Sequence, residues 1–233
     1  MPVHVYTNWN KRQSDLKEQI EPFRKYFFIC EGANTESFYF KKLIDLRKEL
    51  GIHPLIDVCF LEKTETDKNI SFPSNLVKFA FEQKTVETNE FDINRDKMVV
   101  VFDADIFEEK VKGYDMLIET IEESDIAAVT NPNFELFLLL HLKNSYENYI
   151  KGNEKKFLTT DIKNKYSYSY NLLHDITGIN SKKNPNIGDL AQNVLCAISE
   201  EKKINQDIHN CKSIVTSNIG QIIETIINER PEL

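Results

Sequence analysis

Lys97-Met-Val-Val-Val-Phe-Asp-Ala-Asp105 is the stretch of sequence that decides the fold. From Met98 to Phe102 it is apolar without interruption, which is typical of a central parallel strand with both faces covered. The run stops at Asp103, and Asp105 follows two residues later. Residues two apart in an extended segment point to the same side, so we expect these two aspartates to face one site.

The segments on either side of this stretch alternate between strand and helix patterns. The apolar residues Tyr39, Leu43 and Leu46, for example, follow a helical spacing of three and four. In chain order we expect strands at about 25–30, 55–61, 97–102 and 125–130, with helices at about 36–50, 73–81 and 108–123. This alternation predicts an α/β protein with a mostly parallel sheet and flanking helices.

The sequence divides into three regions of different character. Residues 1–24 are polar and predict a loosely attached N-terminal arm, and residues 25–130 carry the α/β core. Residues 131–233 predict a mostly helical extension packed on that core, with helices near 189–205 and 219–229. Residues 131–142 are apolar nearly all round, which predicts a buried helix.

Composition restricts the classes of protein that the chain can belong to. The formal net charge of −8 argues against a generic basic coat for nucleic acid but is compatible with a nucleic-acid enzyme. The 4 cysteines lack CxxC spacing, as expected of small buried hydrophobic residues. With no apolar run of about 20 residues and no signal peptide, we expect a cytoplasmic protein without membrane association.

Carboxylates follow two of the predicted strands directly. Glu31 follows the strand at 25–30, and Asp103 and Asp105 follow the strand at 97–102. Ligands of open α/β sheets gather beyond the carboxyl ends of the strands. Three close carboxylates repel one another unless a cation or a shared proton compensates them. The pattern therefore predicts a site for Mg²⁺, or Mn²⁺, although the residues alone also fit a plain helix start and a turn.

Five further residues are candidates for the site. Glu135 lies in an apolar helix, where an unpaired charge is costly, and Asn131 is expected one turn earlier on the same face. Glu135 either contributes to the metal site or is a hydrogen-bonded structural residue. His141 either binds phosphate or forms a hydrogen bond within the core. Lys155 and Lys156 belong to a lysine- and tyrosine-rich stretch that suits either single-stranded nucleic acid or a solvated surface.

Three blocks of the chain carry a family resemblance. They are Ile29-Cys-Glu-Gly-Ala-Asn-Thr-Glu-Ser-Phe-Tyr-Phe40, Val99-Val-Val-Phe-Asp-Ala-Asp105 and Thr130-Asn-Pro-Asn-Phe-Glu-Leu-Phe-Leu-Leu-Leu-His141. In order and spacing the chain resembles the RloB-like family, which is associated with restriction–modification loci and abortive-infection systems. The resemblance spans roughly residues 24–230. Near the C-terminus the family's Asn-Pro-Ser-Thr-like segment is matched only at Asn218.

The RloB-like family in turn is similar to the Toprim module of topoisomerases, primases and OLD-type nucleases. This resemblance implies a Mg²⁺-dependent phosphodiester enzyme in which Glu31 is the general acid or base and Asp103 and Asp105 hold the metal. Glu36 matches the family's second glutamate, but it also suits the start of a helix for local reasons.

The function expected from this resemblance is a nuclease that cleaves DNA or tRNA in antiviral defence. The resemblance also implies a partner ATPase encoded nearby, and a homo-oligomer is compatible with the sequence. The alternative is a Toprim-like module that performs no hydrolysis and binds a partner ATPase or a nucleotide, because a fold does not entail a reaction.

Overall fold

The computed structural model describes residues 4–7, 21–32, 34–63, 72–104, 113–159 and 166–231. Within these residues, 6 strands form one sheet in the order β1-β3-β2-β4-β5-β6. The inner strands run parallel, and β1 and β6 pair antiparallel at the two edges. The strands are β1 (His4–Tyr6), β2 (Arg24–Cys30), β3 (Ile56–Glu62), β4 (Lys97–Asp103), β5 (Ile126–Asn131) and β6 (Thr216–Ser217).

Helices connect the parallel strands and make up most of the C-terminal half. The α-helices are α1 (Thr35–Asp45), α2 (Pro73–Gln83), α4 (Tyr114–Glu122), α5 (Phe134–Leu139), α6 (Glu154–Leu158), α7 (Tyr168–Thr177), α8 (Val194–Glu201) and α9 (Ile219–Asn228). The 3-10 helices are η1 (Glu87–Asn89), η3 (Pro185–Asn193) and η4 (Ile208–Asn210), and η2 (Tyr146–Ile150) is a π-helix. The predicted class, an α/β protein with a mostly parallel sheet and a largely helical C-terminal part, is confirmed.

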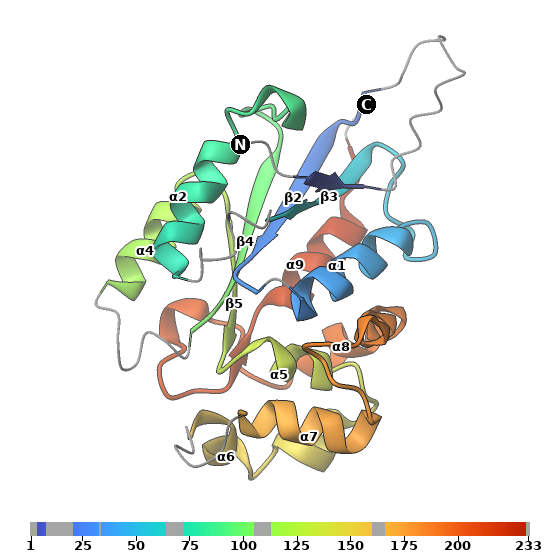
Figure 1. Ribbon diagram of the computed structural model, residues 1–233, viewed down its shortest axis with the longest axis vertical. Coiled ribbons are helices and arrows are strands. Elements are labelled where there is room, and N and C mark those ends of the chain that lie inside the picture. Colours follow the sequence, from blue (N-terminus) through green and yellow to red (C-terminus); the bar gives the residue numbers. More distant parts are fainter. Residues whose placement is uncertain are drawn as a thin grey trace.

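Helices cover both faces of the sheet, as Figure 1 shows. On β2, Phe28 packs into the hydrophobic cluster on the face of α1, α5 and α9, whereas Phe27 packs into the cluster on the face of α2 and α4. Alternate residues of β4 likewise belong to opposite clusters. Because both faces are buried, β4 needs apolar residues at consecutive positions, which explains the run that begins at Met98.

The two edge strands depart from the sequence-based expectation. Residues 1–24 were expected to be a loose arm, but β1 pairs with β3, and Thr7 Oγ1 donates a hydrogen bond of 2.9 Å to Asp57. Residues 1–3 and 8–20 lie outside the described part of the chain. At the opposite edge, β6 returns from the helical half and pairs with β5. A strand of 2 residues is too short for a sequence period to reveal it.

Several predicted helices have different bounds in the structure. Asn131 is the last residue of β5, paired with Thr216, and α5 begins only at Phe134. Asn131 therefore does not share a helical face with Glu135, contrary to expectation. The predicted helix near 189–205 is a 3-10 segment, η3, followed by α8. The predicted helix at 108–123 is described only as α4, because residues 105–112 lie outside the described part.

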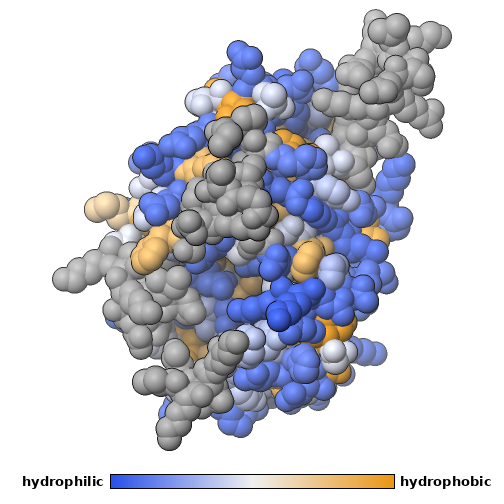
Figure 2. Space-filling view, viewed as in Figure 1, coloured by the Kyte–Doolittle hydropathy of each residue, from blue (hydrophilic) through white to orange (hydrophobic). Residues whose placement is uncertain are grey.

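The surface visible in Figure 2 is mostly hydrophilic, and its hydrophobic residues appear as separate spots. Large exposed apolar side chains of the described residues come from different segments of the chain: Phe72, Ile93, Met116, Ile176, Leu195 and Ile214. Isolated apolar side chains of this kind are normal on a protein surface. Among the described residues, we find no helix with the length and apolar content needed to span a membrane.

Candidate functional site

A topological switch point lies at the carboxyl ends of β2 and β4. These strands are neighbours, but β3 lies beyond β2 on one side and β5 lies beyond β4 on the other. Glu31 continues directly from β2, and its backbone N–H donates a hydrogen bond of 3.0 Å to the Val101 carbonyl of β4. Asp103 is the last residue of β4. Crevices at such positions are where open α/β sheets bind their ligands.

A pocket of about 290 Å³ opens at this switch point. Its lining residues include 4 carboxylates and a lysine: Glu31, Gly32, Asn34, Thr35, Glu36, Asp103, Phe134, Glu135 and Lys182. The structure therefore brings together three residues that the sequence predicted for the site, Glu31, Asp103 and Glu135. The fourth, Asp105, lies outside the described residues.

Hydrogen bonds orient two of the pocket carboxylates. Thr130 Oγ1 donates to Asp103 Oδ1 over 2.7 Å, from the neighbouring position on β5. Ser181 Oγ donates to Glu135 Oε1 over 3.1 Å, and Glu135 is only 5% exposed. Such bonds hold an acidic side chain in one orientation and compensate part of the cost of burying its charge.

Glu36 also faces the pocket, from the first turn of α1. Burial raises the pKa of its carboxyl group, and the nearby Glu135 raises it further, while Lys63 and Lys182 act in the opposite direction. The Glu36 carboxylate lies over Gly32, where an added Cβ would stand 2.1 Å from Oε2. A side chain at position 32 would therefore displace this carboxylate. In the sequence Glu36 carries a weaker signal, because a helix start alone explains an acidic residue there.

Lys182 is a pocket residue that the sequence analysis missed. It lies in the turn after α7, and the backbone of this turn is tied to the start of α1. Asn34 Nδ2 donates to the Lys182 carbonyl, and Thr35 Oγ1 donates to the Ser181 carbonyl, each over 3.1 Å. In the sequence, Asn180-Ser-Lys-Lys183 resembles any polar surface turn. No local signal distinguishes Lys182 from its neighbour.

Asn131 and His141 lie in the protein core and do not line the pocket. Asn131 Nδ2 donates to the carbonyls of Cys211 and Ile214 over 2.7 and 3.1 Å, which fixes the segment before β6. Asn131 is only 2% exposed. The amide nitrogen of Asn131 is therefore engaged in this structural role, and the predicted contact with substrate stays a prediction.

His141 is likewise 2% exposed and is satisfied at both ring nitrogens. Its Nδ1 lies 3.0 Å from the Phe137 carbonyl and its Nε2 lies 2.9 Å from Tyr39 Oη. A carbonyl only accepts, so Nδ1 carries the proton and Nε2 accepts from the tyrosine. Burial lowers the pKa of His141 to about 4. These contacts agree with the alternative of a core hydrogen bond, and the predicted contact with phosphate stays a prediction.

Lys155 and Lys156 lie on α6 and are not among the residues that line the pocket. The ammonium group of Lys156 stands 5.9 Å from the ring centroid of Tyr168. Close by in the sequence, the Tyr166 and Tyr170 rings stack at 4.3 Å. The predicted contact of these two lysines with nucleic acid stays a prediction.

The oxygen donors of the pocket suit a hard divalent cation. Among the described residues, no three acidic, histidine or cysteine side chains already converge as a metal-binding group. Mg²⁺ commonly takes only one or two protein carboxylates and keeps several waters, for which a pocket of about 290 Å³ has room. Glu31 and Asp103 are the residues that would hold it, and the predicted third ligand, Asp105, is outside the described residues.

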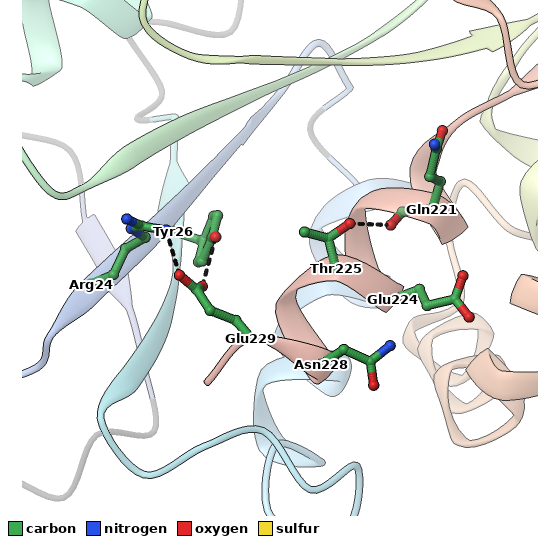
Figure 3. A pocket seen from close by; sticks show the side chains of 7 residues that line it. All are labelled: Arg24, Tyr26, Gln221, Glu224, Thr225, Asn228 and Glu229. Carbon is green, nitrogen blue, oxygen red and sulfur yellow. Dashed lines mark hydrogen bonds and ion pairs between the residues drawn. The ribbon is translucent and has the colours of Figure 1, made fainter. Parts of the chain in front are cut away.

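A larger cavity, of about 590 Å³, lies at the other end of β2, against α9 (Figure 3). Arg24 Nη1 donates to Glu229, and Tyr26 Oη donates to the same carboxylate over 2.7 Å. Burial is the main reason that the pKa of Tyr26 is raised to about 12. This cavity lies at the amino end of a parallel strand, opposite to the edge where such sheets bind ligands. The smaller carboxylate pocket is therefore the candidate site.

The fold and this pocket define an α/β protein with an acidic site at the switch point of its sheet. The chain matches the family model described as RloB-like protein over residues 26–226. Because the match covers most of the chain, this protein belongs to the RloB-like family. Comparison with curated proteins and with solved structures gave no significant match.

Proposed function

We propose that this protein is a Mg²⁺-dependent nuclease that hydrolyses phosphodiester bonds of nucleic acid at the carboxylate pocket. The observation that carries the proposal is the meeting of Glu31 and Asp103, from adjacent parallel strands, in one pocket. Membership of the RloB-like family and the Toprim-like arrangement of these residues support the same activity.

Three carboxylates of the pocket, Glu31, Asp103 and Glu135, have distinct parts in this proposal. Asp103, oriented by Thr130, and Glu31 bind the divalent ion. When bound, that ion supplies positive charge that offsets the developing charge on the phosphoryl oxygens. Glu31, directly after β2, is also the proposed general acid or base, the role that the resemblance to the Toprim module implies for it. Glu135, held by Ser181, adds negative charge that strengthens cation binding.

The first experiment incubates the purified protein with plasmid DNA, single-stranded DNA and total tRNA, in Mg²⁺, Mn²⁺ or EDTA. Cleavage is expected only with a divalent ion, and Asp103→Asn is expected to reduce it by about 10²-fold or more, because a ligand carboxylate is lost. Asp175→Asn is the matched control, since its side chain is 79% exposed on α7. It is expected to cleave at the wild-type rate.

The outcomes separate the proposal from its alternative. Cleavage that survives Asp103→Asn would place the activity elsewhere. An inactive wild-type protein that still binds Mg²⁺, while Asp103→Asn does not, would favour a non-catalytic module that binds a partner ATPase or a nucleotide.

We extend the proposal to an antiviral effector that works with an ATPase encoded nearby. Two points support this role: the chain belongs to the RloB-like family, and RloB-like proteins are associated with restriction–modification and abortive-infection systems. Expression of the chain with and without the neighbouring ATPase, in cells challenged with phage, tests this role. Equal phage yields from wild-type and Asp103→Asn cells under both conditions would contradict it.

A further inference from the structure

We propose that Lys182 binds a phosphate group of the nucleic-acid substrate at the mouth of the carboxylate pocket. This inference rests on the proposed function, because it names a substrate contact of the same site. Lys182 lines the pocket together with Glu31, Asp103 and Glu135, yet it comes from the helical half of the chain, far away in sequence.

The turn that carries Lys182 is fixed from three directions. The Asn180 side chain accepts a hydrogen bond of 3.1 Å from the Lys182 backbone N–H, which shapes the turn. Asn34 and Thr35, at the start of α1, donate to the carbonyls of Lys182 and Ser181. Ser181 is 1% exposed and also donates to Glu135. The position of the lysine backbone is therefore tied to the pocket itself.

The side chain of Lys182, in contrast, is exposed and available to a ligand. Its ammonium lies 5.8 Å from the centroid of the Tyr170 ring, and within the described residues it forms no ion pair. Lys63 differs, because its ammonium donates to the Glu31 carbonyl. A cation at the rim of an acidic pocket is suited to hold a phosphate while the carboxylates hold a divalent ion.

The amino end of α1 points to the same conclusion. Gly32, Asn34 and Thr35 also line the pocket, and α1 has 11 residues, so its helix dipole places partial positive charge there. Lys182 and the start of α1 thus contribute positive potential to the same pocket in which Glu31 and Asp103 contribute negative charge. A phosphodiester with a bound divalent cation carries both of the complementary charges.

The test measures binding separately from cleavage. Fluorescein-labelled single-stranded DNA and labelled total tRNA are titrated with the full chain in EDTA, at several salt concentrations. Lys182→Ala is expected to weaken binding of the preferred probe about tenfold at low salt. It should also reduce the slope of log affinity against log salt by about 0.7–0.9, the change for one lost phosphate contact.

Lys183→Ala is the matched control, because the neighbouring lysine is exposed and does not belong to the pocket lining. It is expected to leave affinity and salt slope unchanged, and Lys182→Arg is expected to keep most of the affinity because it keeps the charge. In a cleaving protein, Lys182→Ala should raise KM more than it lowers kcat.

If Lys182→Ala and Lys183→Ala have the same affinity and the same salt slope, the inference is overturned, even if cleavage assays establish the nuclease. If the wild-type protein never cleaves but Lys182→Ala still reduces the salt slope by about 0.7–0.9, the phosphate contact is sustained while the proposed hydrolysis fails. Absence of binding to both probes would overturn the inference. So would tighter Mg²⁺ binding by Lys182→Ala with unchanged nucleic-acid affinity, because Lys182 would then be only an internal counter-ion for the carboxylates.

Discussion

The pKa of Glu36 responds both to burial and to a neighbouring carboxylate, and this response links the site to the stability of the fold. Its pKa lies above the ordinary value of 4.5, first because of burial and then because of Glu135. A carboxyl group whose pKa rises on folding stabilises the fold in its protonated form. This contribution is fully present below the ordinary pKa and is lost as the pH rises through the folded-state pKa.

Glu36→Gln is therefore expected to raise the melting temperature in EDTA at about pH 8, by a few degrees, because it removes a partly buried charge. Near pH 4 the difference from wild type should shrink, since Glu36 is then increasingly protonated. Thermal denaturation at both pH values measures this. Glu119→Gln, on the exposed side of α4, should change neither melting temperature. A gain of equal size at the two pH values would contradict the assignment to ionisation of Glu36.

At the scale of elements, a glutamate from one helix caps another. Glu201, the last residue of α8, is fully buried and accepts hydrogen bonds from the backbone N–H groups of Gly220 and Gln221 over 2.9 and 2.8 Å. Ser217 Oγ donates to the same carboxylate over 2.5 Å. The first N–H groups of a helix lack partners within it, so Glu201 satisfies the amino end of α9 and fixes β6 beside it.

Glu201→Ala is expected to lower the free energy of unfolding by about 2–4 kcal/mol, because it leaves buried N–H groups without acceptors. Urea denaturation measures the change. The comparison variant is Glu224→Ala on α9, whose ion pair with Lys202 is partly exposed and is expected to matter by less than about 1 kcal/mol. Equal losses in the two variants would show that the cap is energetically unimportant.

At the scale of the whole molecule, the α/β part and the helical part share one core. Phe28 and Phe40 from the first part belong to the same hydrophobic cluster as Phe137 and Ile223 from the second. The sheet is shared as well, because β6 pairs with β5. The boundary at residue 130 therefore marks a change in sequence pattern. The residues before and after it do not form independently packed cores.

The full chain is expected to unfold in a single cooperative transition, whereas a fragment that ends at Thr130 should not fold on its own, because that face of the sheet would lose its cover. Calorimetry of the full chain and an amide NMR spectrum of the fragment test this. A fragment with a dispersed spectrum and its own cooperative transition would contradict the shared core.

The sequence by itself determined the α/β class and three residues of the pocket, because both depend on local order along the chain. Strand and helix periods identified the inner strands, and acidic residues directly after two strands marked the edge where Glu31 and Asp103 meet. Glu135 was found because a charge in an apolar helix needs a partner. These inferences require only neighbouring residues and the general geometry of parallel sheets.

Only the tertiary structure decided the rest. Lys182 reaches the pocket through contacts such as the Thr35–Ser181 hydrogen bond, which joins residues 146 positions apart. The same packing turned Asn131 and His141 into the core, where their polar groups are consumed by backbone and tyrosine partners. A local pattern shows that a residue is polar, but its partner is chosen by long-range packing, which places distant segments side by side.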